Sequence, residues 1–558
     1  MMARNRIAGL SMRWLLVLFV AVLLGLGRPA VAQGPGADDK TADKPDWASL
    51  LGFDRPAAQA RYDDERTAEG WVWARVKQDR IADLNLRCDA SGKTRPDPRD
   101  DPGWDDPCRK IPAGFITDVL TAPRWRDRIG RHGFRLQGAR IEGDIDLANA
   151  DIRPEVWIEA SRIEGNLDLT GGHLAGSLSL RGTRVRGDLA AERLRTDGGL
   201  HLGDRAGFKG NVFLAGARVG GQLTMSGSRF EQTVDAQGAT IEKSVLATDA
   251  RFAQPVDLTF THIVGSLKLT GAVATRIDLT NAVIGEVLTL GDSGAQLQWQ
   301  CAGLAHADTN WPLGDQDGRS TNCARDSDKP IPAMILRNAH IGALQDNAEA
   351  WPPELDLEGF KYDRIGGIGG TGAADMRRRS PEQWRDWLDR DPTFSSQPYT
   401  QLAGVLLAAG YRDTAESVLY YEQERERRAA LARGDWRGGA WLTLLWAVAG
   451  YGIGTYTFRV LYWVGGLTVL GTLMLLTAPK ARRHGLLWCF GASLQRLLPI
   501  IEFNKGFKDF FDNPPPATNG EKRNLNGFQV FFFSVLALTG WVLGFVLLAA
   551  MTNLAPRG

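Results

Sequence analysis

An eleven-residue pattern that recurs from residue 132 to residue 290 constrains the fold of this chain more than any other feature. Each unit carries a small residue, an apolar residue, a bend position and two more apolar residues, each two positions apart, as in Ala139, Ile141, Gly143, Ile145 and Leu147. Apolar residues two apart are typical of strands, and glycine or proline at a bend suits a sharp corner. The bend positions are Gly143, Pro154, Gly165, Gly176, Gly187, Gly198, Gly210, Gly221, Gln232, Lys243, Gln254, Gly265, Thr275 and Glu286.

A fixed period indicates one structural unit stacked on copies of itself. Two units close one roughly square coil, so the fourteen units between His132 and Glu286 give about seven coils. The pattern resumes after residue 330, where one or two further coils are expected. At ~4.8 Å between stacked strands, seven coils span about 35 Å. The sequence therefore predicts an all-β, parallel, right-handed β-helix over residues 132–370, interrupted by an insertion at 291–330.

The repeat also resembles a known class of proteins. Triplets such as Ala139-Arg140-Ile141 are similar to the core triplet of pentapeptide-repeat proteins, although every second unit here is one residue longer. The run from Gly138 to Leu147 and the segment 397–433 resemble bacterial β-helix membrane proteins of unassigned function. Some of those proteins are labelled membrane-associated oxidoreductases. The resemblance implies a β-helix attached to a membrane.

Residues 1–32 have the organisation of a secretory signal. Arg4, Arg6 and Arg13 precede an apolar run at 14–26, and small residues at 30–32 offer a cleavage site. An uncleaved signal anchor is the alternative. The polar residues 33–68 predict a linker.

The five cysteines are distributed as two local pairs and one single residue. Cys88 and Cys108 bracket one polar loop, Cys301 and Cys323 bracket another, and Cys489 lies apart. This spacing predicts two disulfides and an oxidising compartment. A zinc site is the alternative, but the chain has neither a CxxC motif nor a neighbouring histidine pair to support it.

The segments around the repeat differ from it in composition. Residues 69–131 are predicted to cap the first coil, because an open end would expose unpaired strand edges. Residues 371–436 predict a solvated helical neck. Residues 437–558 predict a membrane domain with spans at 460–477 and 528–551.

Between the two spans, residues 486–501 are apolar but include Arg496 and Pro499, which predicts an in-plane or re-entrant helix. An exported β-helix would place the loop 478–526 in the cytoplasm, and its lysines and arginines agree with the positive-inside rule. The arginines at 425–437 favour the opposite orientation. The signal and the cysteines together favour export.

Candidate reactive groups are sparse on the predicted β-helix. Asp146, Asp168 and Asp257 share one position of the repeat and are expected to form an outward acid row, as a sugar-cleaving site would need. His173 and His262 also share a position, but they lie too many units apart for one zinc ion. Residues 367–372 match the dinucleotide fingerprint without the βαβ context that it requires. The sequence therefore predicts no catalytic, cofactor-binding or metal-binding residues, and no cofactor.

The formal net charge of +1 does not favour nucleic acid as a partner. The sequence predicts a non-enzymatic protein of the bacterial inner membrane whose β-helix projects into the periplasm and binds an envelope protein or a glycan. An oligomer is compatible with this interpretation. One alternative is a channel-like or sensor protein with two spans and a re-entrant helix. A second alternative is a β-helix enzyme that acts on polysaccharide.

Overall fold

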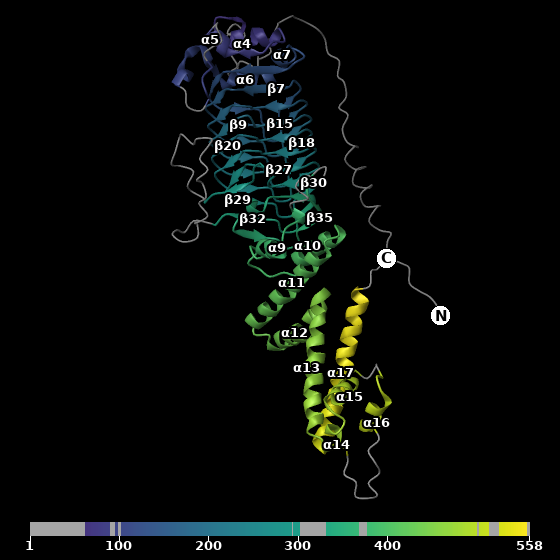
Figure 1. The fold of residues 1–558 in the computed structure, drawn as a ribbon. Helices are drawn as coiled ribbons and strands as arrows, with labels where there is room; N and C mark the ends of the chain where they lie inside the picture. The colour runs from purple at the N-terminus through teal and green to yellow at the C-terminus, as the bar shows by residue number, and fades with distance from the viewer. Residues whose placement is uncertain are drawn as a thin grey trace, which may run out of the picture. The chain divides into compact units, whose positions relative to one another are not determined.

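The computed structural model describes residues 62–89, 95–98, 102–292, 294–301, 331–367, 376–498, 502–512 and 524–554, all within one compact unit. Its largest part is a parallel β-helix of about nine turns (Figure 1), because nine strands stack on each of two faces. The predicted fold class is therefore confirmed. The segments 1–32 and 33–61 lie outside the described residues.

One coil consists of four short strands, β6 (Asp151–Ile152), β7 (Val156–Glu159), β8 (Arg162–Ile163) and β9 (Leu167–Asp168). The next strand, β10 (His173–Leu174), lies in register on β6, with His173 opposite Asp151. Each coil takes about 22 residues, so two eleven-residue units close one turn as predicted. The four strand positions define four faces, which we name after β6, β7, β8 and β9.

The strands of each face follow in chain order. The β6 face continues through β10, β14 (Arg195–Thr196), β18 (Arg218–Val219), β22 (Thr240–Ile241) and β26 (His262–Ile263). The β7 face contains β3 (Phe134–Gln137), β7, β11 (Leu178–Ser179), β15 (Leu200–His201), β19 (Leu223–Thr224), β23 (Val245–Leu246) and β27 (Leu267–Lys268). Three longer strands join these two faces into one sheet, namely β30 (Val283–Thr289), β33 (His340–Gln345) and β35 (Lys361–Ile365).

The β8 face and the β9 face are separate sheets of nine strands each. The β8 face contains β2 (Lys110–Pro112), β4 (Arg140–Glu142), β8, β12 (Arg184–Val185), β16 (Gly207–Phe208), β20 (Arg229–Phe230), β24 (Arg251–Phe252), β28 (Val273–Ala274) and β31 (Gln298–Trp299). The β9 face contains β5 (Ile145–Asp146), β9, β13 (Leu189–Ala190), β17 (Val212–Phe213), β21 (Val234–Asp235), β25 (Val256–Asp257), β29 (Arg276–Asp278), β32 (Ala333–Ile335) and β34 (Glu354–Asp356).

The interior of the coils is filled by the predicted small and apolar residues, such as Ala139, Ile141, Ile145 and Leu147, which are almost fully buried. On the β8 face the inward column includes an aromatic stack. The ring centroids of Phe208 and Phe230 lie 5.0 Å apart, and those of Phe230 and Phe252 lie 5.1 Å apart. Parallel register places identical side chains on top of each other, so this face is packed by ring stacking.

The sharpest corners of the backbone do not coincide with most of the predicted bend positions. Within residues 132–290, most residues with positive φ lie five positions before a bend, in two columns. One column contains Asn149, Gly171, Arg193, Gly216, Gly238, Phe260, Asn281, Asn338 and Gly359. The bend glycines Gly165, Gly187 and Gly210 have no positive φ; they allow successive coils to approach closely, because a Cβ atom on Gly187 would lie 2.6 Å from the carbonyl oxygen of Gly165.

A helical segment covers the first coil (Figure 1). It consists of α4 (Ala68–Lys77), α5 (Leu84–Cys88), α6 (Ala113–Thr121) and α7 (Pro123–Arg126), with β1 (Ala82–Asp83) and the short 3₁₀ turns Pro102–Asp105 and Pro107–Arg109. Strands β1 and β2 pair in parallel with β3 and β4 of the first coil. A disulfide joins Cys88 to Cys108, as predicted. Cys301 is also disulfide-bonded, and its predicted partner Cys323 lies outside the described residues.

Three helices follow the last coil. Helices α9 (Pro381–Leu388) and α10 (Gln397–Ala408) pack on it, and α11 (Arg412–Ala432) packs on α10 and α9. Nε2 of Gln397 donates to the carbonyl oxygen of Phe360 at 2.8 Å, and Nε2 of Gln401 donates to that of Tyr362 at 2.6 Å. The indole of Trp384 is buried in the same core as the coils. Helices α9 and α10 of the predicted neck therefore form a packed cap and not a solvated linker, because their apolar side chains complete the core of the β-helix.

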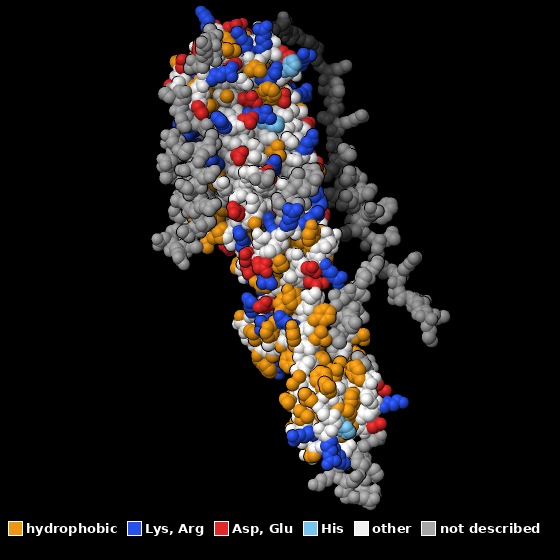
Figure 2. Space-filling view, viewed as in Figure 1, with side chains coloured by type: hydrophobic (Ala, Val, Ile, Leu, Met, Phe, Trp, Pro, Cys, Tyr) orange, Lys and Arg blue, Asp and Glu red, His pale blue; other side chains and the backbone are white. Residues whose placement is uncertain are grey.

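The C-terminal region is helical. It consists of α12 (Trp436–Ala449), 3₁₀ turns at Gly450–Gly452 and Gly454–Arg459, α13 (Val460–Leu476), α14 (Pro479–Arg482), α15 (Leu486–Leu497), α16 (Lys505–Asp512) and α17 (Gly527–Leu554). Two helical stretches, Gly454–Leu476 and Gly527–Val546, are long and apolar enough to cross a membrane. Figure 2 shows hydrophobic side chains gathered over these helices, in contrast to the mixed surface of the coils.

Candidate binding surfaces on the β-helix

Stacking in register converts a residue type that recurs every 22 positions into a column on one face. On the β8 face the outward residue at the start of each strand is basic in six of nine strands. We call this set the basic column. It contains Lys110, Arg140, Arg162, Arg184, Arg229 and Arg251, with Gly207 between Arg184 and Arg229.

At its N-terminal end the basic column is closely surrounded by carboxylates and loops. Nε of Arg140 lies 3.1 Å from Oε1 of Glu164, and Arg140 also pairs with Asp105. Nε of Arg162 donates to the carbonyl oxygen of Pro98 at 2.5 Å, and its guanidinium lies 5.1 Å from the ring centre of Trp104. These contacts hold the first arginines against the N-terminal segment.

Further along, cations are in register with cations. Arg186 and Lys209 come two residues after Arg184 and Gly207, so they enlarge the positive patch beside Arg229. Partial burial lowers the pKa of Arg251, and the positive charge of Arg229 lowers it further. Like charges placed directly opposite each other destabilise a sheet. Acidic side chains offset part of this charge, because Nη1 of Arg186 lies 2.8 Å from Oε2 of Glu164 and Nε of Arg229 lies 4.0 Å from Oε1 of Glu231.

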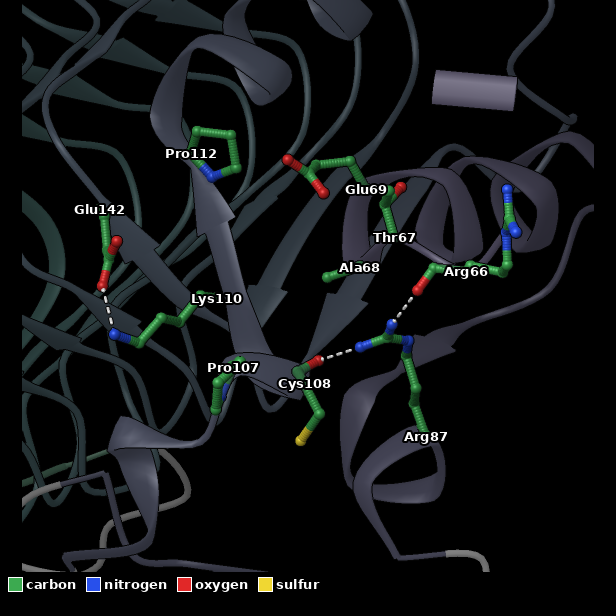
Figure 3. A pocket seen from close by; sticks show the side chains of 10 residues that line it. All are labelled: Arg66, Thr67, Ala68, Glu69, Arg87, Pro107, Cys108, Lys110, Pro112 and Glu142. Atoms are coloured by element: carbon green, nitrogen blue, oxygen red, sulfur yellow. Dashed lines mark hydrogen bonds and ion pairs between the residues drawn. The ribbon is translucent and has the colours of Figure 1, made fainter. Parts of the chain in front are cut away.

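A pocket of about 690 Å³ adjoins the first residue of the basic column (Figure 3). Nζ of Lys110 lies 3.3 Å from Oε1 of Glu142. Arg87 donates to the carbonyl oxygens of Cys108 and Arg66, each at 2.7 Å. The disulfide at Cys108 thus fixes one wall of a pocket that contains both acidic and basic groups.

The predicted acid row lies on the β9 face, and the structure brings only part of it together. Asp146 is opposite Asp168 in adjacent coils. Asp257 lies four coils beyond Asp168, between Asp235 and Asp278, which the sequence reading did not include. A search for acids at 22-residue spacing would have found Asp235.

The carboxylates of this row stabilise turns. Oδ1 of Asp168 accepts the amide N–H of Thr170 at 2.9 Å, Oδ1 of Asp257 accepts that of Thr259 at 2.9 Å, and Oδ1 of Asp146 accepts that of Ala148 at 3.1 Å. Asp235 and Asp278 make the same contact with the residue two positions on. This is the Asx-turn role of aspartate, so the recurrence of the row follows from the recurrence of the corner.

His173 and His262 lie in one column of the β6 face, four strands apart. Nδ1 of His173 lies 3.0 Å from Oδ1 of Asp151, and its Nε2 lies 3.5 Å from Oδ1 of Asp197. These two carboxylates raise the pKa of His173, with Asp151 the larger cause. His262 is opposite Thr240 and Val283. Among the described residues, no three His, Cys, Asp or Glu side chains are grouped closely enough to hold a metal ion.

The dinucleotide-like segment lies outside the described residues from position 368 onward, so its interpretation stays a prediction. The resemblance to pentapeptide-repeat membrane proteins is likewise a prediction from the sequence. Comparisons of the chain with protein-family models, with curated proteins and with solved structures find no match.

Proposed function

We propose that this chain is a membrane-anchored, non-enzymatic protein whose β-helix is a rigid binding scaffold on the periplasmic side of the bacterial inner membrane. The membrane anchor is supported by the location of the exposed large apolar side chains. Most of them belong to residues 436–548, including Leu461, Tyr462, Leu470, Phe531 and Leu538. Exposed apolar surface on this scale would be unfavourable in water and marks a surface that contacts lipid or protein.

The scaffold role is supported by how the β-helix uses its polar groups. Its acid row is engaged in turn hydrogen bonds, and its aromatic rings and aliphatic side chains fill the interior. Helices cover both the first and the last coil. A closed rod of this kind offers long flat faces with columns of identical side chains, which suits the binding of an extended ligand.

The periplasmic orientation is supported by the disulfides. Cys88 and Cys108 are bonded, and Cys301 is bonded as well. Disulfides persist in oxidising compartments and are rare in the cytosol. Lys480 and Arg482 in α14 follow the first candidate span, as expected for a loop on the cytoplasmic side.

The test combines membrane extraction with thiol labelling in intact cells. The Cys489→Ser variant removes the cysteine in α15, so that the label reports on the remaining four. The protein should stay in the membrane after alkaline carbonate washing. A membrane-impermeant maleimide should label Cys88 and Cys108 only after an impermeant reductant is added. Cysteines that are free in untreated cells and protected from the impermeant label would contradict the periplasmic placement.

A second candidate, a channel-like or sensor protein, is favoured by the position of α15. The C-terminal end of α15 packs on the second candidate span, where a Cβ atom on Gly540 would collide with the carbonyl oxygen of Leu497. Its centre packs on the first, where Ser493 lies 3.1 Å from a Cβ atom built on Gly471. Small residues at such contacts let membrane helices approach closely. Ion flux through proteoliposomes that is abolished by Gly540→Leu would favour this candidate over the scaffold.

A further inference from the structure

Two arginines are packed on one tryptophan at the junction between the C-terminal cap and the first candidate span. Arg427 lies on α11, and Arg459 ends the 3₁₀ turn that leads into α13. The guanidinium carbon of each lies 5.3 Å from the ring centre of Trp446 on α12. Three elements thus bring two positive charges to one aromatic ring, in the region where α11, α12 and α13 meet (Figure 1).

Neither charge is neutralised by a carboxylate of the described chain. Among the residues that the structure describes, no carboxylate oxygen lies within 4.0 Å of either guanidinium. Two acids of α11 are paired with other arginines, because Glu416 lies 2.9 Å from Arg412 and Glu424 lies 2.6 Å from Arg428. The two arginines on Trp446 therefore need a counter-ion from outside the chain.

The groups that do contact these two arginines are neutral. Nη1 of Arg459 donates to the carbonyl oxygen of Trp446 at 3.2 Å, and Nε of Arg427 is buried without a hydrogen-bond partner. Burial raises the pKa of Tyr451, and the positive charge of Arg427 beside it offsets part of the rise. Both arginine side chains are partly exposed. A guanidinium has five N–H donors, so each can still donate to an anion.

The side chains around Arg459 indicate the source of that anion. Phe458, Leu461 and Tyr462 flank it in the apolar stretch Gly454–Leu476, and they are 39%, 48% and 81% exposed. Aromatic residues at the end of a span lie at the level of the lipid headgroups. A lipid whose acyl chains cover this surface therefore has its phosphate at the level of Arg459.

We propose that Arg427 and Arg459 bind the headgroup phosphate of an anionic phospholipid in the leaflet that faces the β-helix. A guanidinium matches the geometry of a phosphate through two parallel hydrogen bonds. A headgroup with net negative charge suits two cations better than phosphatidylcholine, whose own ammonium repels them. The inference rests on the membrane anchor proposed above and names the lipid that the anchor holds.

The site also accounts for a conflict in the charge pattern. In the proposed orientation the arginines at 425–437 lie outside the cytoplasm, where the positive-inside rule disfavours them. Arg425 is paired with Asp389 at 3.2 Å, within the chain. A lipid phosphate provides the corresponding partner for Arg427, so positive charge at this boundary is neutralised in place.

Native mass spectrometry of the purified full chain measures this binding, with phosphatidylglycerol and phosphatidylcholine of identical acyl chains as probes. The unmodified protein should bind phosphatidylglycerol at least about tenfold more tightly, because arginines at a membrane surface favour anionic lipid. In Arg427→Gln/Arg459→Gln the preference should fall to within about twofold. Equal affinity of the unmodified protein for both lipids would overturn the proposal.

The matched control is Arg433→Gln/Arg437→Gln. It changes the net charge equally, at two exposed positions between Arg427 and Trp446 in the sequence. Its preference for phosphatidylglycerol should stay within about twofold of that of the unmodified protein, since solvated charges contribute little. An equal loss in both double variants would show attraction by net charge and would overturn the proposal.

Two further measurements exclude a soluble ligand and a folding artefact. Glycerol 3-phosphate in large molar excess should not displace the lipid, and displacement would assign the site to a soluble phosphate instead. Arg427→Lys/Arg459→Lys keeps both charges without the planar fork and should retain part of the preference. A lysine variant with no preference would mean that the arginines only pack on Trp446. Failure of the unmodified chain to enter lipid nanodiscs would instead contradict the membrane anchor, so the two proposals fail separately.

Discussion

Arg379 and Asp346 form a buried ion pair, with 2.7 Å between Nη2 of Arg379 and Oδ1 of Asp346. Oδ2 of Asp346 accepts a second hydrogen bond from Nη1 of Arg379 at 3.0 Å and one from the indole N–H of Trp351. Asp346 directly follows β33, and Arg379 directly precedes the N-cap of α9. The pair therefore joins the coils to the cap that covers their last turn.

Removing one partner of this pair should destabilise the cap strongly. Arg379→Met leaves the carboxylate of Asp346 buried without its cation, a change that costs about 3–5 kcal/mol. We expect a lower urea midpoint, followed by the fluorescence of the tryptophans around the cap. Arg378→Met alters an exposed neighbour and should change stability by less than about 0.5 kcal/mol. Similar midpoints for the two variants would show that the pair does not hold the cap.

The contribution of His173 should depend on pH. The pKa of His173 is raised above its usual value of 6.5 and that of Asp151 is lowered below its usual 3.8, in each case chiefly by the hydrogen bond between them. The histidine's contribution is complete below pH 6.5 and is lost as pH rises through the raised pKa. The aspartate's contribution is lost as pH falls through the lowered pKa. His173→Gln should therefore lower the Tm at pH 6 and leave it unchanged at pH 9.

His262→Gln is the control for this titration, because the residues opposite His262 in the two neighbouring coils are Thr240 and Val283, and neither carries a carboxylate. Its effect on the Tm should be the same at both pH values. A His173→Gln effect that persists at pH 9 would mean that the histidine acts through packing rather than charge.

Glycines of the coils should tolerate substitution only where the neighbouring coil leaves space. A Cβ atom on Gly187 would lie 2.6 Å from the carbonyl oxygen of Gly165, so Gly187→Ala should cost about 1–3 kcal/mol by forcing the coils apart. The nearest atom to a Cβ on Gly207 is 4.0 Å away. Gly207→Ala should therefore be neutral or stabilising, by up to about 1 kcal/mol. Urea midpoints of the two variants measure the difference, and equal midpoints would contradict a close approach at Gly187.

Phe260 occupies a corner whose backbone favours a different residue. Its φ is 56°, and its side chain is 60% exposed. In the same column, Asn149, Asn281 and Asn338 adopt this conformation, which asparagine tolerates far better than an aromatic residue. Phe260→Asn should raise the free energy of unfolding by about 1 kcal/mol. A lower midpoint would indicate that the exposed ring makes a stabilising contact.

The eleven-residue period was sufficient to predict the four-sided coil and its buried side chains, because inward positions admit only apolar residues. The same period does not predict which outward residues share a face, since successive eleven-residue units lie on opposite sides of the coil. Arg140, Arg162 and Arg184 form a column because they are 22 residues apart. Reading outward residues at that spacing would have revealed the basic column and the complete acid row.

Other features depend on contacts that no local pattern encodes. The left-handed corners accept Arg193 and Phe260 as well as glycine, so composition does not mark them. The C-terminal cap depends on Gln397 and Gln401 reaching carbonyl oxygens of the last coil. Sequence periodicity shows that such helices exist but not which surface they cover.

The two helical caps decide how many molecules can share one stack of coils. Strands β1 and β2 already occupy the hydrogen-bonding edge of the first full coil, and α10 donates to carbonyl oxygens of the last one. A parallel stack with bare ends would template further copies and grow into a filament. With both ends occupied, growth stops at a single chain, and the length of the rod is set by its gene rather than by polymerisation.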